Sequence, residues 1–142
     1  MKNIDLAVSR FKGGLSCSQA IFSTYGKELG IDNETAIKIS APFGGGMAMM
    51  GETCGAVTGA FMVIGLKYAK DKDSKEKVYS VVKKFVDEFT TRNKSIICKE
   101  LLGYDMSIPE GMNNIKEKNL IKTICPKLVK DAAEILEKLL LA

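Results

Sequence analysis

Hydrophobic residues recur every three or four positions through most of the chain, which is the spacing of one buried face of an α-helix. The clearest example follows Ser74, a residue type that often caps helix N-termini. The apolar side chains there fall on one face and the charged ones elsewhere; they are Val78, Val81, Val82, Phe85 and Phe89. No segment keeps the apolar–polar alternation of a half-buried strand. The pattern predicts an all-α bundle of about six to eight helices.

Capping residues indicate where the first helices begin and end. The spacing predicts a short helix over Asn3–Lys12, closed by two glycines. Ser16 and Gln19 form an S-x-x-Q capping box, which makes Ser16 the N-cap of a second helix and puts Cys17 in its first turn. Gly30 is the predicted end of that helix.

Three later helices are predicted from the same kinds of signal. Asp32 or Asn33 caps a helix that ends at Pro42. Ser95 caps a short helix closed by Gly103. Proline suits the first turn of a helix, so Pro126 predicts the start of the final helix, with Cys125 as its N-cap.

The segment 104–122 is polar and the least regular part of the chain. We interpret it as a loop with one or two helical turns that acts as a lid.

A glycine-rich stretch at 42–68 contains the least polar helix of the chain. Gly44, Gly45 and Gly46 predict a loop with backbone conformations closed to other residues. Thr53 is the predicted N-cap of the helix that follows, which places Cys54 in the first turn. This helix is apolar on almost every side, so it is predicted to be the buried centre of the bundle.

Glycines recur at every fourth position of this stretch, at Gly51, Gly55 and Gly59. They leave a stripe without side chains where another backbone can approach closely. The partner on that stripe is either a second copy of the chain, in a homodimer, or another helix of the same chain.

Composition narrows the class of protein. The 142 residues suit one domain, 1–142, and 46% hydrophobic with 27% charged residues is typical of a soluble globular protein. The net charge of +4 comes from dispersed lysines, which argues against a nucleic-acid surface. Residues 1–11 do not read as a secretory signal, and the apolar run 54–66 is too short to cross a hydrocarbon core of about 30 Å. We therefore expect a cytoplasmic protein without a membrane span.

The absence of histidine removes the usual general base, the common nucleophile pairs and the commonest transition-metal ligand. Any chemistry therefore depends on other side chains, and the four cysteines are the leading candidates. No two of them form a C-x-x-C pair. Each falls at the start of a predicted helix, and they are Cys17, Cys54, Cys98 and Cys125. A helix N-terminus stabilises a thiolate, so four thiolates could converge where several helices begin. The alternative is that they are inert core residues.

The residues around Cys54 carry a resemblance to a known family. Cys54 to Gly59 reads C-G-A-x-x-G, with Cys17 upstream and Cys98 and Cys125 downstream. Two further stretches belong to the resemblance, F-G-G-G-M at 43–47 and M-G-E-T-C at 50–54. The chain resembles the C_GCAxxG_C_C family of redox-active proteins over nearly its full length. The resemblance implies an all-helical redox protein of bacteria or archaea with the four cysteines as active groups. Similar domains occur attached to cytochrome-type electron carriers, which implies an iron–sulfur cluster.

Two classes of function follow. In the first, the four cysteines converge and ligate an iron–sulfur cluster, so that the chain passes electrons to a redox partner protein rather than acting as a classical enzyme. The glycines predicted to lie against this cofactor are Gly44, Gly45, Gly46 and Gly55. A structural zinc site and a metal-free dithiol pair are alternatives within this class. In the second, the chain is a small helical binding or assembly module with inert cysteines.

Overall fold

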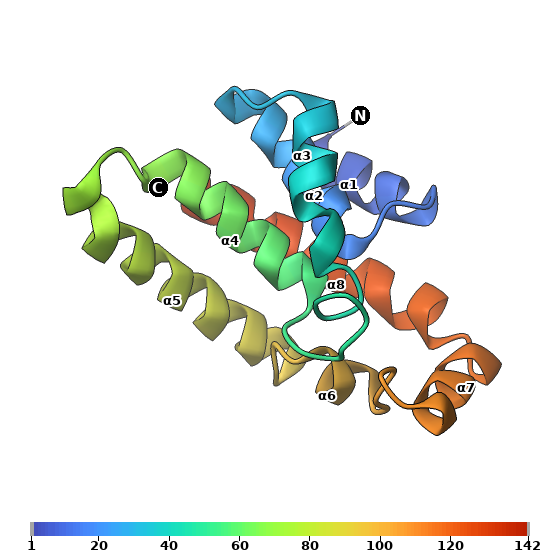
Figure 1. Cartoon of the computed structure of the whole chain (residues 1–142). Helices are drawn as coiled ribbons and strands as arrows, with labels where there is room; N and C mark the ends of the chain where they lie inside the picture. The colour runs from blue at the N-terminus through green and yellow to red at the C-terminus, as the bar shows by residue number, and fades with distance from the viewer. Residues whose placement is uncertain (1, 142) are drawn as a thin grey trace.

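The computed structural model describes residues 2–141, and within that range it contains eight α-helices and no β-strand (Figure 1). The helices are α1 (Asn3–Lys12), α2 (Cys17–Gly26), α3 (Asn33–Ser40), α4 (Gly55–Tyr68), α5 (Lys75–Asn93), α6 (Cys98–Leu102), α7 (Pro109–Glu117) and α8 (Leu120–Leu140). Short 3₁₀ turns follow α2 and α3 and precede α5, at Lys27–Leu29, Ala41–Phe43 and Lys72–Ser74. The all-α prediction is confirmed.

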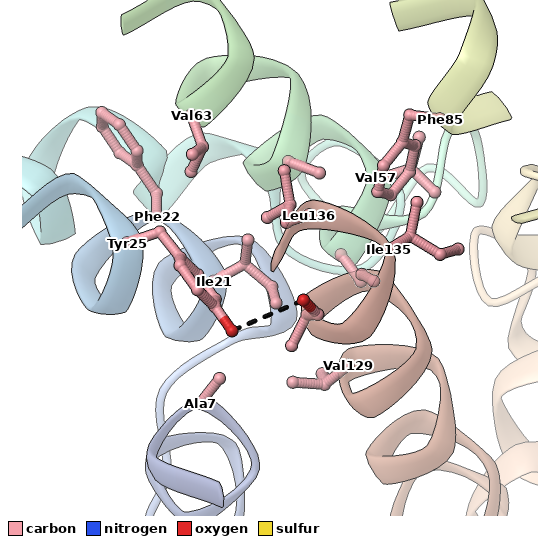
Figure 2. Packing of buried hydrophobic residues seen from close by; sticks show 14 of the residues in the cluster. Ala7, Ile21, Phe22, Tyr25, Val57, Val63, Phe85, Val129, Ile135 and Leu136 are labelled. Carbon is pink, nitrogen blue, oxygen red and sulfur yellow. Dashed lines mark hydrogen bonds between the residues drawn. The ribbon is translucent and has the colours of Figure 1, made fainter. Parts of the chain in front are cut away.

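The bundle is built around α4 and α8. Helix α8 runs behind α4, α5 lies along one side of this pair, and α1 to α3 cover the other side (Figure 1). Their buried side chains form one apolar cluster between α2, α4, α5 and α8 (Figure 2). The Tyr25 hydroxyl at its edge donates to Glu137 Oε2 over 2.7 Å and lies 3.5 Å from the carbonyl oxygen of Ala133. No helix among residues 2–141 is both long and apolar enough to cross a membrane.

The glycines of α4 explain how closely α2 packs against it. A Cβ atom on Gly59 would lie 2.9 Å from the carbonyl oxygen of Ser18, and one on Gly55 would lie 3.0 Å from the Ser18 nitrogen. At those two positions the partner of the stripe is an internal helix. Gly51 is not part of the stripe, because it precedes the helix in a left-handed conformation with φ of 72°. The homodimer stays a prediction.

Most predicted helix boundaries are confirmed, with a few corrections. Ile97 and not Ser95 is the N-cap of α6, and α2 ends at Gly26, so that Gly30 closes the 3₁₀ turn that follows it. Cys125 is not an N-cap. Helix α8 begins at Leu120, so Pro126 and Cys125 lie inside it. Proline lacks an N–H, so the carbonyl of Lys122 loses its usual helical hydrogen bond. The turn before Pro126 is held instead by packing, because Ile121 and Ile124 contact the buried cluster around Cys98 and Cys125.

The segment 104–122 is more helical than predicted. Nine of its residues form α7, with Pro109 as the first residue, and α7 packs against α8. A Cβ atom on Gly111 would lie 1.9 Å from the carbonyl oxygen of Asp105, so only glycine permits this packing. That the segment acts as a lid stays a prediction.

Candidate functional site

All four cysteines line a single cavity of about 900 Å³. The cavity lies where the starts of α2, α4 and α6 meet the first half of α8. Cys54, Cys98 and Cys125 are buried, Cys17 is half-buried, and all four are free thiols. Cysteines separated by tens of residues in the sequence therefore reach the same place. Three of them stand at helix starts as predicted, and Cys125 does not.

The first cysteine is positioned by the predicted capping box. Ser16 Oγ accepts a hydrogen bond from the Gln19 N–H, and Gln19 Oε1 accepts one from the Ser16 N–H. Cys17 is the first residue of the helix that this box begins. Its Cβ atom would lie 3.2 Å from a Cβ on Gly55, so the absent side chain of Gly55 lets the starts of α2 and α4 meet.

Two further cysteines are held by a short backbone pairing. Thr53 and Ile97 form an antiparallel β-bridge. The Cys54 N–H donates to the Ile96 carbonyl over 2.7 Å, and the Cys98 N–H donates to the Glu52 carbonyl over 2.6 Å. Cys54 and Cys98 thus lie on adjacent, hydrogen-bonded segments. The prediction of Thr53 as the N-cap of α4 is wrong. Thr53 belongs to the bridge, and Cys54 is the N-cap.

The glycine loop beside the cysteines is left-handed over five consecutive residues. Gly45, Gly46, Met47, Ala48 and Met49 all have φ between 50° and 70°. Three of them carry side chains, and each such residue costs roughly 1–2 kcal/mol in this conformation. Strain of this kind persists only where the surrounding structure enforces it.

The loop is enforced by close contact with the cysteine segments. A Cβ atom on Gly46 would lie 2.7 Å from Cys98 Cβ and 2.6 Å from the Glu52 nitrogen. The Glu52 N–H donates to the Gly46 carbonyl over 2.9 Å. The predicted glycines Gly44, Gly45, Gly46 and Gly55 all line the cavity. That they contact a cofactor stays a prediction.

The thiols differ in how readily they ionise. Hydrogen bonding to Cys125, together with burial and the charges of the other cysteines, raises the pKa of Cys17 well above its usual value. The same bond lowers the pKa of Cys125. The two thiols therefore behave as a pair, in which the remaining S–H stabilises the first thiolate formed.

The other two thiols stay protonated at neutral pH. Burial raises the pKa of Cys54 to about 11, although the N–H groups of Ala56 and Val57 at the start of α4 act in the opposite direction. Burial and the neighbouring cysteines raise the pKa of Cys98 to about 12. Within residues 2–141, no three His, Cys, Asp or Glu side chains form a group that could hold a metal ion as they stand.

The fold and the site together describe an all-helical protein whose four free thiols lie around one cavity. The sequence model of the family described as "Putative redox-active protein (C_GCAxxG_C_C)" matches residues 15–139. The chain belongs to this family and, by the family's description, to the redox-active proteins. No match was found among curated proteins or among solved structures.

Several residues of the cavity were missed by the sequence analysis. Phe11, Lys12 and Leu15 line it from the end of α1 and the turn after it, and Ile121 and Lys122 line it from the start of α8. The apolar members could have been found as helix-face residues. The lysines carry no local signal, because the sequence does not show which lysines face a cavity.

Proposed function

We propose that this protein transfers electrons through an iron–sulfur cluster ligated by its four cysteines. The observation that supports this most directly is the shared cavity, which brings Cys17, Cys54, Cys98 and Cys125 together from four helices. Four cysteine thiolates are the usual donor set of such clusters. When bound, the cluster supplies one-electron exchange.

The walls of the cavity fit such a group. Gly46 lies against Cys98 and Gly55 against Cys17, so backbone without side chains adjoins two of the thiols. The starts of α2 and α4 place the positive ends of two helix dipoles beside the thiols, which favours thiolates. Because the pKa values of Cys54 and Cys98 are raised, binding releases protons and should strengthen as the pH rises.

A single zinc ion fits less well. A Zn–S bond of about 2.3 Å in a tetrahedral site requires sulfur atoms about 3.8 Å apart. The described side chains form no group tight enough for one ion. A cluster has several metal atoms and so accepts more widely spaced thiolates.

A metal-free dithiol is the second candidate, favoured by the contact between Cys17 and Cys125. Oxidation of the pair forms one S–S bond and releases two protons and two electrons, which reduce the disulfide of a partner to two thiols. The thiolate that the hydrogen bond stabilises is the nucleophile in this exchange.

The proposal includes the cellular setting. Four free cysteines suit a reducing compartment, so we place the protein in the cytoplasm, and the family resemblance favours a bacterial or archaeal cell. The electron acceptor or donor is proposed to be a separate redox protein.

The test is elemental analysis for iron, zinc and acid-labile sulfide on protein purified without oxygen, with the visible spectrum recorded on the same sample. Iron and sulfide in equal amounts support the cluster. Metal-free protein whose Cys17 and Cys125 form a reversible disulfide supports the dithiol instead.

The variants Cys54→Ser and Cys98→Ser sharpen this test. Each is expected to lose the cluster. Met106→Leu is the matched control, because Met106 brings a sulfur to the same cavity but is not a proposed ligand. Iron and sulfide retained at wild-type levels in both cysteine variants would contradict the cluster.

A further inference from the structure

The cavity reaches beyond the cysteines. One part of its wall, here called the lysine side, consists of Phe11, Lys12, Leu15, Ile121 and Lys122. It comes from the end of α1, the turn after it and the start of α8, and α1 packs against α8. None of these residues carries a thiol, so the proposed cluster does not account for them.

The charged side chains of the lysine side are all positive. Lys12 and Lys122 are the only charged side chains among the described residues that line the cavity, because no aspartate, glutamate or arginine joins them. Neither lysine takes part in an ion pair or a side-chain hydrogen bond within residues 2–141. The positive end of α2 at Ser16 and Cys17 also lines the cavity and adds to the same potential.

The other three residues of the lysine side are apolar. Phe11, Leu15 and Ile121 are half-buried, so each presents part of its side chain to open space. A volume of about 900 Å³ is within the range of cavities that hold small organic ligands, roughly 300–1,000 Å³. A mostly apolar lining with a few convergent charges is the usual composition of such sites.

We propose that the lysine side binds a small organic anion, with an apolar, ring-sized body against Phe11, Leu15 and Ile121 and its acidic group facing Lys12 and Lys122. Bound there, the anion lies in the same cavity as the four thiols. Its role as a redox substrate rests on the proposed function, whereas its binding is a separate property of the lysines and the apolar wall.

Anilinonaphthalene sulfonate is a suitable probe, because it joins an apolar ring body to one anionic group and fluoresces when it leaves water. Its uncharged parent, anilinonaphthalene, is the matched probe without the anion. Both are titrated into folded, reduced wild-type protein and into the double variant Lys12→Gln/Lys122→Gln. Lys130→Gln is the control, because it removes an exposed lysine that lies on α8 but not in the cavity wall.

We expect the wild type to bind the sulfonate at a saturable site more tightly than the uncharged parent. The double variant should bind the sulfonate roughly tenfold more weakly, with added salt reducing the difference. Affinity for the uncharged parent should stay the same in all three proteins. Circular dichroism and thermal unfolding establish that each protein is folded, because this dye also binds loosened cores.

Three outcomes overturn the proposal: no saturable sulfonate binding to the wild type, equal affinity for the two dyes, or an unchanged sulfonate affinity in the double variant. Repeating the titration on Cys54→Ser separates this proposal from the cluster. Sulfonate binding retained in a variant that never held metal shows an anion site whether or not the redox function is right. If Lys12→Gln/Lys122→Gln keeps its iron but no longer binds the sulfonate, the cluster does not depend on the anion site.

Discussion

The apolar cluster between α2, α4, α5 and α8 and the cysteine cavity at the starts of α2, α4 and α6 are held together in different ways. The cluster is filled by whole side chains, such as Phe85 and Phe89, whose rings stack with centroids 5.9 Å apart. Beside the cysteines the cavity is bounded partly by backbone, with glycines where a Cβ would meet a cysteine segment and a loop in a strained conformation. The first region is stabilised by burial, and the second is maintained by the fold around it. We expect the two to respond differently to mutation.

Phe85→Ala tests the apolar region and has the largest expected effect on stability. Phe85 is fully buried and packs edge-on against Phe61, so its removal leaves a cavity and should lower the free energy of unfolding by about 3–5 kcal/mol. Urea unfolding measures the change. Tyr79→Ala is the control on the same helix, because Tyr79 is 56% exposed and should change stability by less than about 1 kcal/mol. Equal losses in the two variants would show that burial does not set stability here.

Gly46→Ala tests the cysteine region. Its Cβ would meet Cys98 at 2.7 Å, so we expect a loss of roughly 2 kcal/mol and a faster alkylation of Cys98, measured by mass spectrometry. Gly30→Ala is matched, because Gly30 also has positive φ but has open space where a Cβ would stand. Gly30→Ala should lower the free energy of unfolding by about 1 kcal/mol and leave the alkylation rate of Cys98 unchanged. Identical alkylation of Cys98 in the two variants would contradict the close contact.

The pH dependence of stability separates the thiols from the core. The folded-state pKa values of Cys54 and Cys98 lie at about 11 and about 12, above the unfolded value of 9.0. Unfolding therefore lets these thiols ionise more easily, so their contribution is complete below about pH 9 and is lost as the pH rises through the folded values. Urea unfolding of metal-free, reduced protein should show this decline, and Cys54→Ala should reduce it. A variant with the same decline as wild type would rule out Cys54 as a source.

Ala48→Gly has the smallest expected effect, and its sign matters more than its size. Ala48 has φ of 50°, so replacement by glycine should relieve strain and raise stability by about 0.5–1 kcal/mol. Ala41 also lines the cavity but has right-handed backbone, so Ala41→Gly should lower stability by a similar amount. Thermal unfolding of the two variants compares the signs. A loss of stability in both would mean that the left-handed loop is not strained at Ala48.

Local signals in the sequence determined most of the helices. The capping box at Ser16 and Gln19, the Asp32 cap that accepts from the Thr35 N–H and the glycine that ends α6 all lie where predicted. Each is an interaction between residues a few positions apart. The apolar character of α4 likewise predicted its buried position at the centre of the bundle.

The tertiary structure decided how the cysteines meet. Pro126 read as a helix start, but contacts of Ile121 and Ile124 with distant residues extend α8 back to Leu120, and Cys125 lies within it. The bridge between Thr53 and Ile97 joins segments more than forty residues apart, so no local sequence pattern predicts it.

The sequence by itself determined the all-α class, the helix caps at Ser16 and Asp32 and the identity of the four cysteines as candidate groups. Only the tertiary structure decided that they share a cavity, that a left-handed loop borders it, and that Lys12 and Lys122 line its wall. The physical reason is range. Caps and periodicity act within one or two turns of a helix, whereas the cavity depends on packing between helices that are far apart in the chain.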